Sequence, residues 1–169
     1  MNEINAGVIV IGDSIAYYAT EEILNRRPNW NINAQRGREV NRLPVIIDNM
    51  NQDAKIYQAV IIELGTNISE GWTRTDYFNC VESLPTLTTK FFVTPRVHHQ
   101  GLERNATVNR YADWMEWVAA NRSDTFIIDW RAEVNANPDL LPDGVHPNQE
   151  GQNILARIMA QGVSSTLNA

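Results

Sequence analysis

Three residues of the sequence have the types that a serine nucleophile, its base and an orienting acid require. Ser14 follows Gly12-Asp13, and Asp143 lies three residues before His146 in one short segment. A serine hydroxyl attacks a carbonyl only when a base takes its proton, and a carboxylate on the other imidazole nitrogen orients that base. The residue types therefore predict a catalytic triad of Ser14, His146 and Asp143.

Each of these motifs also has an ordinary structural interpretation. Ser14 could simply cap a helix, which serine does well, and Asp143-Gly144 could be a turn before a surface histidine. His98 and His99 are competing bases, although neither has a carboxylate close by in the sequence. The catalytic prediction therefore depends on where the fold places the motifs.

Asn67 and Gly37 are the candidates for stabilising an oxyanion. A tetrahedral intermediate needs preorganised hydrogen-bond donors. The side-chain amide of Asn67, in Gly65-Thr66-Asn67, could supply one donor, and the backbone N–H groups of Ser14 and Gly37 could supply others. The alternative for Gly65-Thr66-Asn67 is a turn that caps the next segment.

Strand and helix patterns alternate along the chain. Continuous apolar runs with many β-branched residues favour strands that are covered on both faces, and helical spacing separates them. This alternation predicts a three-layer α/β/α, flavodoxin-like fold with a five-stranded parallel sheet, in which residues 1–169 form one domain. The predicted strands are 7–11, 59–64, 91–94, 126–129 and, more weakly, 30–34, and the predicted helices are 15–26, 40–51, about 76–83, 103–121 and 149–162, the last with Asn148 as its N-cap.

The candidate catalytic residues come directly after predicted strands. Ser14 follows the strand at 7–11, Asn67 follows the strand at 59–64, and the Asp143–His146 segment lies between the last strand and the last helix. Ligands of such folds bind outside the carboxyl ends of the strands. We therefore expect these side chains to meet at one edge of the sheet.

Composition excludes several other classes of protein. The 169 residues, with 43% hydrophobic and 20% charged residues, suit one globular domain. The net charge of -6 argues against a general nucleic-acid binder. No apolar run reaches the length of a membrane span, and the N-terminus has no signal-peptide pattern, so we expect either a complete cytoplasmic protein or a domain cut from a longer one.

Nothing in the sequence predicts a cofactor or a metal. Cys80 is the only cysteine, which excludes an intrachain disulfide and a cysteine-based zinc site. The three histidines lack a ligand spacing typical of metal hydrolases. The G-x-G-x-x-G and P-loop patterns are absent, which argues against a nucleotide or flavin module.

Four sequence blocks resemble the SGNH hydrolase superfamily, also called the GDSL family, which is named for Ser, Gly, Asn and His. The resemblance extends from Val8 to the last predicted helix. It implies an α/β/α fold, a serine-dependent acyl transfer and an oxyanion hole built by Ser14, Gly37 and Asn67. The matching blocks are Gly12-Asp13-Ser14, Gly37, Gly65-Thr66-Asn67 and Asp143-Gly144-Val145-His146-Pro147.

A narrower likeness is to the extracytoplasmic catalytic domain of bacterial peptidoglycan O-acetyltransferases, carried by residues 62–67, 93–97 and 143–147. It implies an acetyl-serine intermediate, an acetyl-ester donor and a carbohydrate acceptor, the muramic acid of peptidoglycan. It also implies a location at the bacterial cell surface, with a membrane acyltransferase domain in the same parent protein. The alternative is a stand-alone carbohydrate acetylesterase or lipase-like ester hydrolase, either cytoplasmic or secreted.

Four further residues are predicted to shape an acceptor groove, namely Trp72, Trp130, Arg96 and His98. Aromatic rings suit sugar faces, and an arginine suits a carboxylate. The structural alternative is that Trp130 packs beside a strand end and that Arg96 pairs with an acidic neighbour. A carbohydrate-binding protein with an inactive triad is a further alternative, disfavoured because every triad residue is present.

Overall fold

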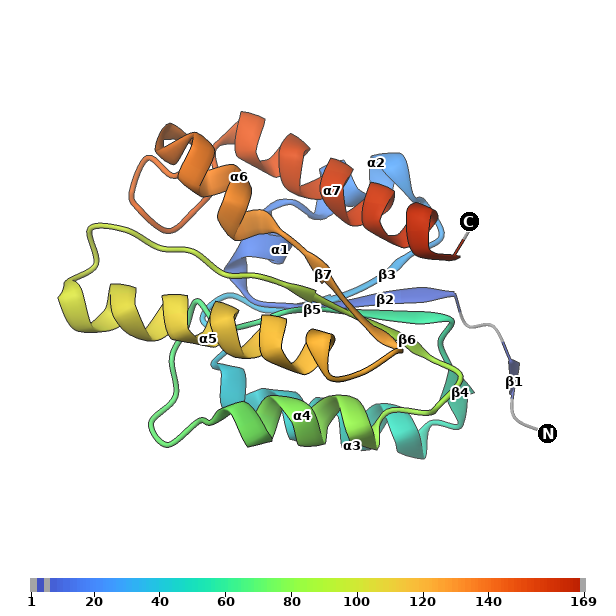
Figure 1. The fold of residues 1–169 in the computed structure, drawn as a ribbon. Helices are drawn as coiled ribbons and strands as arrows, with labels where there is room; N and C mark the ends of the chain where they lie inside the picture. Colours follow the sequence, from blue (N-terminus) through green and yellow to red (C-terminus); the bar gives the residue numbers. More distant parts are fainter. Residues whose placement is uncertain (1–2, 5–6, 168–169) are drawn as a thin grey trace.

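A computed structural model, which describes residues 3–4 and 7–167, shows a parallel sheet between two layers of helices (Figure 1). The sheet has five strands in the order β3-β2-β5-β6-β7, and every pairing is parallel. The predicted fold class and all five predicted strands are confirmed. The strands are β2 (Val8–Gly12), β3 (Asn31–Ala34), β5 (Ala59–Glu63), β6 (Thr89–Val93) and β7 (Thr125–Ile128).

The helices are divided between the two faces of the sheet (Figure 1). One face carries α1 (Ser14–Tyr18), α2 (Thr20–Arg26), α6 (Trp130–Ala136) and α7 (Gln149–Leu167), and the other carries α3 (Leu43–Gln52), α4 (Arg74–Ser83) and α5 (Leu102–Ala120). The 3-10 turns are η1 (Val40–Arg42) and η2 (Pro138–Leu140). No helix in the described ranges 3–4 and 7–167 is both long and apolar enough to cross a bilayer.

A short parallel pair, β1 (Glu3–Ile4) with β4 (Lys55–Ile56), lies apart from the main sheet.

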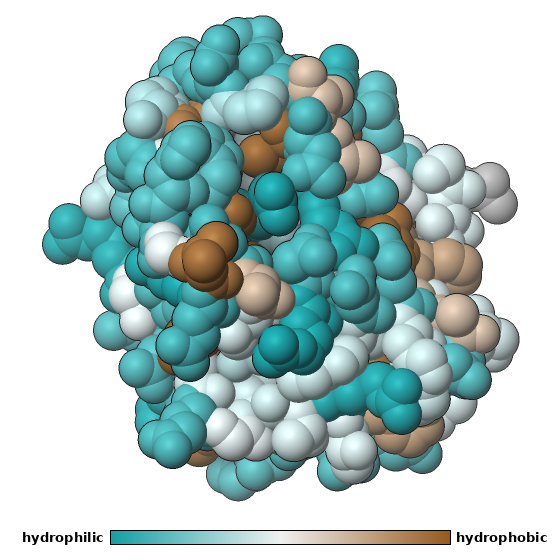
Figure 2. Space-filling model, turned by 60° about the vertical axis from the view of Figure 1, so that its left-hand side comes forward, coloured by the Kyte–Doolittle hydropathy of each residue, from teal (hydrophilic) through white to brown (hydrophobic). Residues whose placement is uncertain are grey.

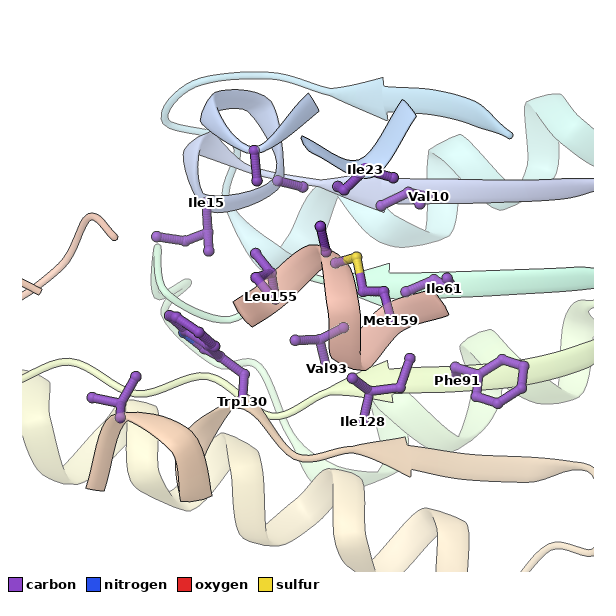
Figure 3. Packing of buried hydrophobic residues seen from close by; sticks show 14 of the residues in the cluster. Val10, Ile15, Ile23, Ile61, Phe91, Val93, Ile128, Trp130, Leu155 and Met159 are labelled. Atoms are coloured by element: carbon purple, nitrogen blue, oxygen red, sulfur yellow. The ribbon is translucent and has the colours of Figure 1, made fainter. Parts of the chain in front are cut away.

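Two hydrophobic clusters, one on each face, hold the layers together. Alternate residues of a strand point to opposite faces, so β2 sends Val10 to one cluster and Ile11 to the other. On the first face, Val10 and Ile61 pack against Met159 of α7 and Ile23 of α2 (Figure 3). Every residue of β2 and β5 is buried, which explains why these strands read as continuous apolar runs.

The helix predicted at 15–26 is two helices in the structure, α1 and α2. The hydroxyl of Thr20 donates to the carbonyl oxygens of Ala16 (3.1 Å) and Tyr17 (2.8 Å) at the junction. Such local side-chain bonds compete with the helical ladder and favour a break. As a result, α1 is a separate helix of five residues that follows β2 directly.

The C-terminal region contains one confirmed helix and one that the sequence did not predict. Asn148 caps α7 as predicted, accepting the Gly151 N–H at 2.9 Å, and α7 extends beyond the predicted end to Leu167. The unpredicted helix is α6, capped by Asp129, whose Oδ1 accepts the Ala132 N–H at 3.0 Å. Its seven residues are too few for an apolar periodicity to stand out.

Leu140 in η2 tests the packing beneath the C-terminal loop. Leu140 is fully buried, whereas Leu102 is 91% exposed. We expect Leu140→Ala to lower the free energy of unfolding by about 2–5 kcal/mol, because it leaves a cavity, and Leu102→Ala to change it by less than about 0.5 kcal/mol. Urea denaturation measures both. Equal effects of the two substitutions would contradict the packing described here.

Candidate active site

Ser14, His146 and Asp143 form one hydrogen-bonded chain at the carboxyl edge of the sheet. The Ser14 Oγ lies 3.1 Å from the His146 Nε2, and the His146 Nδ1 lies 2.7 Å from the Asp143 Oδ2. The sequence separates Ser14 from His146 by 132 positions, and the fold brings them together. This is the geometry in which a histidine can take a serine proton while a carboxylate holds its other nitrogen.

Asp143 orients the base with one oxygen and shapes its loop with the other. The Oδ1 accepts the backbone N–H groups of Val145 (2.9 Å) and His146 (2.7 Å), while the Oδ2 binds the imidazole. Partial burial opposes ionisation of this carboxyl, but the hydrogen bonds from His146 and Val145 outweigh it and lower the pKa of Asp143 to about 2. Asp143 therefore stays ionised at neutral pH, as the orienting role requires.

A neighbouring loop clamps the segment that carries the base. The His98 N–H donates to the Gly144 carbonyl at 2.9 Å, and the Gln100 side-chain amide donates to the Asp143 carbonyl at 3.0 Å. Gly144 has a φ of +82°, and a Cβ added there would collide with the His98 carbonyl. Glycine is therefore required at this position both for its backbone conformation and for the close approach of the two loops.

Ser14 is the first residue of α1, immediately after β2, and its backbone N–H is free. Carboxyl oxygens take the N–H groups on either side: the Asp13 Oδ1 accepts that of Ile15 (2.9 Å), and the Glu63 Oε1 accepts those of Ala16 (2.7 Å) and Asp13 (3.3 Å). Within the described part of the chain, the Ser14 N–H has no such acceptor. It is therefore available to the oxyanion of a tetrahedral intermediate, which forms on the carbonyl oxygen when the Ser14 Oγ attacks the carbonyl carbon.

The two other predicted oxyanion donors lie beside Ser14. The Asn67 Nδ2 donates to the Asp13 Oδ2 at 3.4 Å, and the Asn67 carbonyl accepts the Val40 N–H at 3.2 Å. Gly37, with a φ of +74°, lines the same groove as Ser14 and Asn67. The structure thus brings the predicted donors of all three sequence blocks to the nucleophile.

The groove around the nucleophile has a volume of about 480 Å³ and opens on a largely hydrophilic face (Figure 2). Sequence analysis did not predict five of its lining residues as site residues. Tyr18 was detectable, since it lies four residues after Ser14 and so on the same side of α1; its ring meets that of His146 edge-on at 5.8 Å. The lining comprises Ser14, Tyr18, Arg36, Gly37, Asn67, Gln100, Arg104, Asp143, Val145 and His146.

None of the four predicted acceptor-groove residues lines this groove. Trp72 is 9% exposed and packs edge-on against Tyr77 at 5.2 Å, and Trp130 is 2% exposed within the core (Figure 3). The prediction that these two tryptophans contact substrate is therefore corrected, because both rings are used for packing. Arg96 and His98 line a separate depression of about 260 Å³, where the His98 Nε2 lies 3.1 Å from the Pro138 carbonyl oxygen.

Residues 3–4 and 7–167 contain no cluster of three or more His, Cys, Asp or Glu side chains arranged to hold a metal ion. Cys80, on α4, is buried, and burial raises the pKa of its thiol to about 12, so the thiol is not a nucleophile at neutral pH.

Similar proteins are found by comparison with solved structures and not by comparison of sequences. No family model matches the sequence, and no curated protein matches it. The catalytic C-terminal domain of peptidoglycan O-acetyltransferase A (OatA) from Streptococcus pneumoniae, solved with a methylsulfonyl adduct, superposes with a TM-score of 0.88 at 24% identity, over 98% of this chain and 97% of that domain.

Two further solved structures superpose over nearly their full length. A lipolytic protein of the G-D-S-L family from Veillonella parvula has a TM-score of 0.72 at 16% identity, covering 94% of this chain and 97% of its own. The esterase EstA from Pseudoalteromonas has a TM-score of 0.65 at 14% identity, covering 98% and 100%. The chain has the SGNH hydrolase fold. The fold expected from the sequence blocks is thereby confirmed, and the candidate triad lies at the carboxyl edge of an SGNH-type sheet.

Removing the orienting carboxylate tests the geometry of the candidate triad. In Asp143→Asn the neutral amide no longer stabilises a protonated His146, so we expect the rate at which a fluorophosphonate labels Ser14 to fall by at least about 10²-fold. Asp139→Asn, at an exposed carboxyl nearby, is the matched control and should label at the wild-type rate. Unchanged labelling of Asp143→Asn would contradict the role given to Asp143.

Proposed function

We propose that the chain catalyses serine-dependent acetyl transfer through an acetyl-Ser14 intermediate, with a carbohydrate hydroxyl, that of peptidoglycan muramic acid, as acceptor. The observation that carries the proposal is the continuous hydrogen-bonded chain from the Ser14 Oγ through His146 to Asp143. The Ser14 N–H, which has no acceptor among the described residues, lies beside that chain, and the fold is shared with the OatA catalytic domain.

The first half of the reaction forms the acyl-enzyme. The His146 Nε2 takes the proton of the Ser14 hydroxyl while the Oγ attacks the ester carbonyl carbon. The N–H of Ser14, the amide of Asn67 and the N–H of Gly37 stabilise the oxyanion. The bond to the leaving alcohol then breaks as His146 returns the proton to its oxygen, and Ser14 retains the acetyl group.

The second half depends on which hydroxyl reaches the acyl-enzyme. His146 deprotonates a sugar hydroxyl or a water, whose oxygen attacks the acetyl carbon. The bond from that carbon to the Ser14 Oγ then breaks as His146 returns the proton to the Oγ. The cations Arg36 and Arg104 line the groove together with Tyr18. Polar and cationic linings of this kind suit a sugar that carries a carboxylate, as muramic acid does. The OatA domain, which belongs to a peptidoglycan O-acetyltransferase, supports the same acceptor.

Ester hydrolysis is the second candidate function, and the exposure of the site favours it. The side chains of His146 and Asp143 are 42% and 57% exposed, so water has access to the base. Transfer requires an acceptor that displaces this water. EstA, which shares the fold, is named as an esterase.

The likeness to OatA also carries our proposals on location and partners. We place the chain at the extracytoplasmic face of a bacterial cell, where an acetyl ester supplied through a membrane acyltransferase domain of the same parent protein would be the donor. Peptidoglycan glycan would be the acceptor. A secreted or cytoplasmic esterase would need neither the membrane domain nor the glycan.

Turnover of an aryl acetate, with and without a peptidoglycan oligosaccharide that contains muramic acid, separates these functions. We expect wild type to release the aryl alcohol and Ser14→Ala to retain only residual activity, because the nucleophile is gone. If the chain is a transferase, added oligosaccharide receives the acetyl group, detected by mass spectrometry. If the oligosaccharide changes nothing, the chain is an esterase. Equal turnover by Ser14→Ala and wild type would contradict both functions.

The role of Asn67 gives a prediction with a magnitude. Asn67→Ala should lower kcat for aryl acetate hydrolysis by about 10²–10³-fold with little change in KM, since the amide acts mainly in the transition state. Asn153→Ala, on the exposed side of α7, is the matched control. A wild-type kcat in Asn67→Ala would exclude Asn67 from the oxyanion hole.

A further inference from the structure

Two buried carboxyl groups lie directly beneath the nucleophile, and the acyl-transfer steps do not use them. Asp13 is fully buried and Glu63 is 3% exposed. Neither forms an ion pair with a lysine or arginine within the described residues. Burying a carboxylate without a cationic partner is costly, so the pair needs a physical explanation.

Glu63 controls the helix turn that carries Ser14. The parallel register of β2 and β5 sets Gly12 opposite Glu63. From there the Glu63 Oε1 accepts the N–H groups of Ala16 at 2.7 Å and Asp13 at 3.3 Å. A Cβ on Gly12 would lie 3.0 Å from this oxygen and 2.5 Å from the Ala16 Cβ. Glycine at this position therefore makes room for the contact.

Asp13 connects that turn to Asn67. Its Oδ1 accepts the Ile15 N–H at 2.9 Å and caps α1, while its Oδ2 accepts the Asn67 Nδ2 at 3.4 Å. One hydrogen of the Asn67 amide is thereby directed to Asp13, which fixes the plane of the amide and leaves its second hydrogen for another acceptor. The position of this donor thus depends on an acceptor oxygen at residue 13.

We propose that Asp13 and Glu63 are positioning residues of the oxyanion hole, in which the Glu63 carboxyl holds the backbone of Asp13 and the first turn of α1, and the Asp13 carboxyl holds the amide of Asn67. This inference rests on the proposed acyl-transfer function. Asp13 then positions the Asn67 amide in addition to capping α1, and Glu63, the last residue of β5, positions the turn that carries Ser14.

The charges around the pair agree with this division of roles. Burial is the largest effect and raises the pKa of Asp13 to about 6, although the hydrogen bond with Glu63 and the charge of His146 oppose it. Burial and the charge of Asp13 raise the pKa of Glu63 well above its usual range. Arg38 and Tyr77 are the other titratable groups that face the pair. Of the two carboxyls, Glu63 therefore keeps its proton to the higher pH.

A double-mutant cycle tests whether Asp13 acts through Asn67. Asp13→Ser keeps a hydroxyl that can cap α1 but removes the oxygen that binds the Asn67 amide. We expect it to lower kcat, with little change in KM, by no more than the roughly 10²–10³-fold loss of one oxyanion donor. The double variant Asp13→Ser/Asn67→Ala should be no slower than Asn67→Ala alone, because the two residues act as one unit. Asp53→Ser, at an exposed carboxyl, is the control.

Glu63 is tested by a conservative rescue. Glu63→Gln keeps the oxygen that accepts the Ala16 N–H and offers an amide N–H to Asp13, whereas Glu63→Leu offers neither. We expect Glu63→Gln to restore most of the kcat that Glu63→Leu loses. Because a buried acid with a raised pKa favours folding less as pH rises above its unfolded value of 4.5, Glu63→Gln should also gain stability relative to wild type as pH rises toward neutral.

A readout without turnover keeps this inference separate from the proposed function. The side-chain amide resonances of Asn67 in an NMR spectrum should shift in Asp13→Ser and stay unchanged in Asp53→Ser. If wild type shows no Ser14-dependent turnover, the proposed function fails, while these resonances still decide the link between Asp13 and Asn67.

Three results would overturn the inference. The first is a double variant Asp13→Ser/Asn67→Ala whose loss of kcat equals the product of the losses in the two single variants. The second is an Asn67 amide resonance that does not move in Asp13→Ser. The third is loss of the fold in Asp13→Ser and Glu63→Gln but not in Asn67→Ala, which would make the pair structural.

Discussion

The parallel register between β2 and β5 places Gly12 opposite Glu63. From this position the Glu63 carboxyl binds the Asp13 and Ala16 N–H groups and so holds the turn that carries Ser14. Oxygens of Glu63 and Asp13 take the N–H groups that flank Ser14 and leave the Ser14 N–H free. The nucleophile with its N–H and the Asn67 amide therefore follow the adjacent strands β2 and β5, and the third candidate donor, Gly37, follows the neighbouring strand β3. Preorganised donors of this kind need no rearrangement when charge develops on the substrate.

The base is held by a different part of the molecule. His146 arrives after the edge strand β7 and must be carried back to Ser14 by a loop, which is fixed by buried Leu140 beneath it, by the His98 backbone beside it and by Asp143 within it. Its half of the site is more exposed than the buried carboxyls below the nucleophile. The candidate triad thus joins a buried half to an exposed loop, and residues of both halves line the groove.

The sequence was informative wherever local pattern decides structure. Continuous apolar runs predicted four of the strands, a weaker pattern predicted the fifth, and polar motifs at the strand ends predicted which side chains would meet. It was uninformative where tertiary contacts decide. The presence of a tryptophan in the sequence does not show whether its ring faces a groove or the core. Trp72 and Trp130 were therefore predicted to line the acceptor groove, although both are buried. The register that sets Glu63 against α1 also arises only when β2 and β5 pair, and a carboxyl at the end of an apolar run does not reveal it.

The central claim, that Ser14 carries the acyl group, is tested most directly by trapping the intermediate. Wild type is mixed with an aryl acetate, quenched in acid within the first turnover and digested, and its peptides are analysed by mass spectrometry. We predict one acetyl group on Ser14, present in wild type and absent from Ser14→Ala. Acetylation at any other residue, or turnover with no acyl-enzyme while Ser14→Ala remains active, would contradict the account.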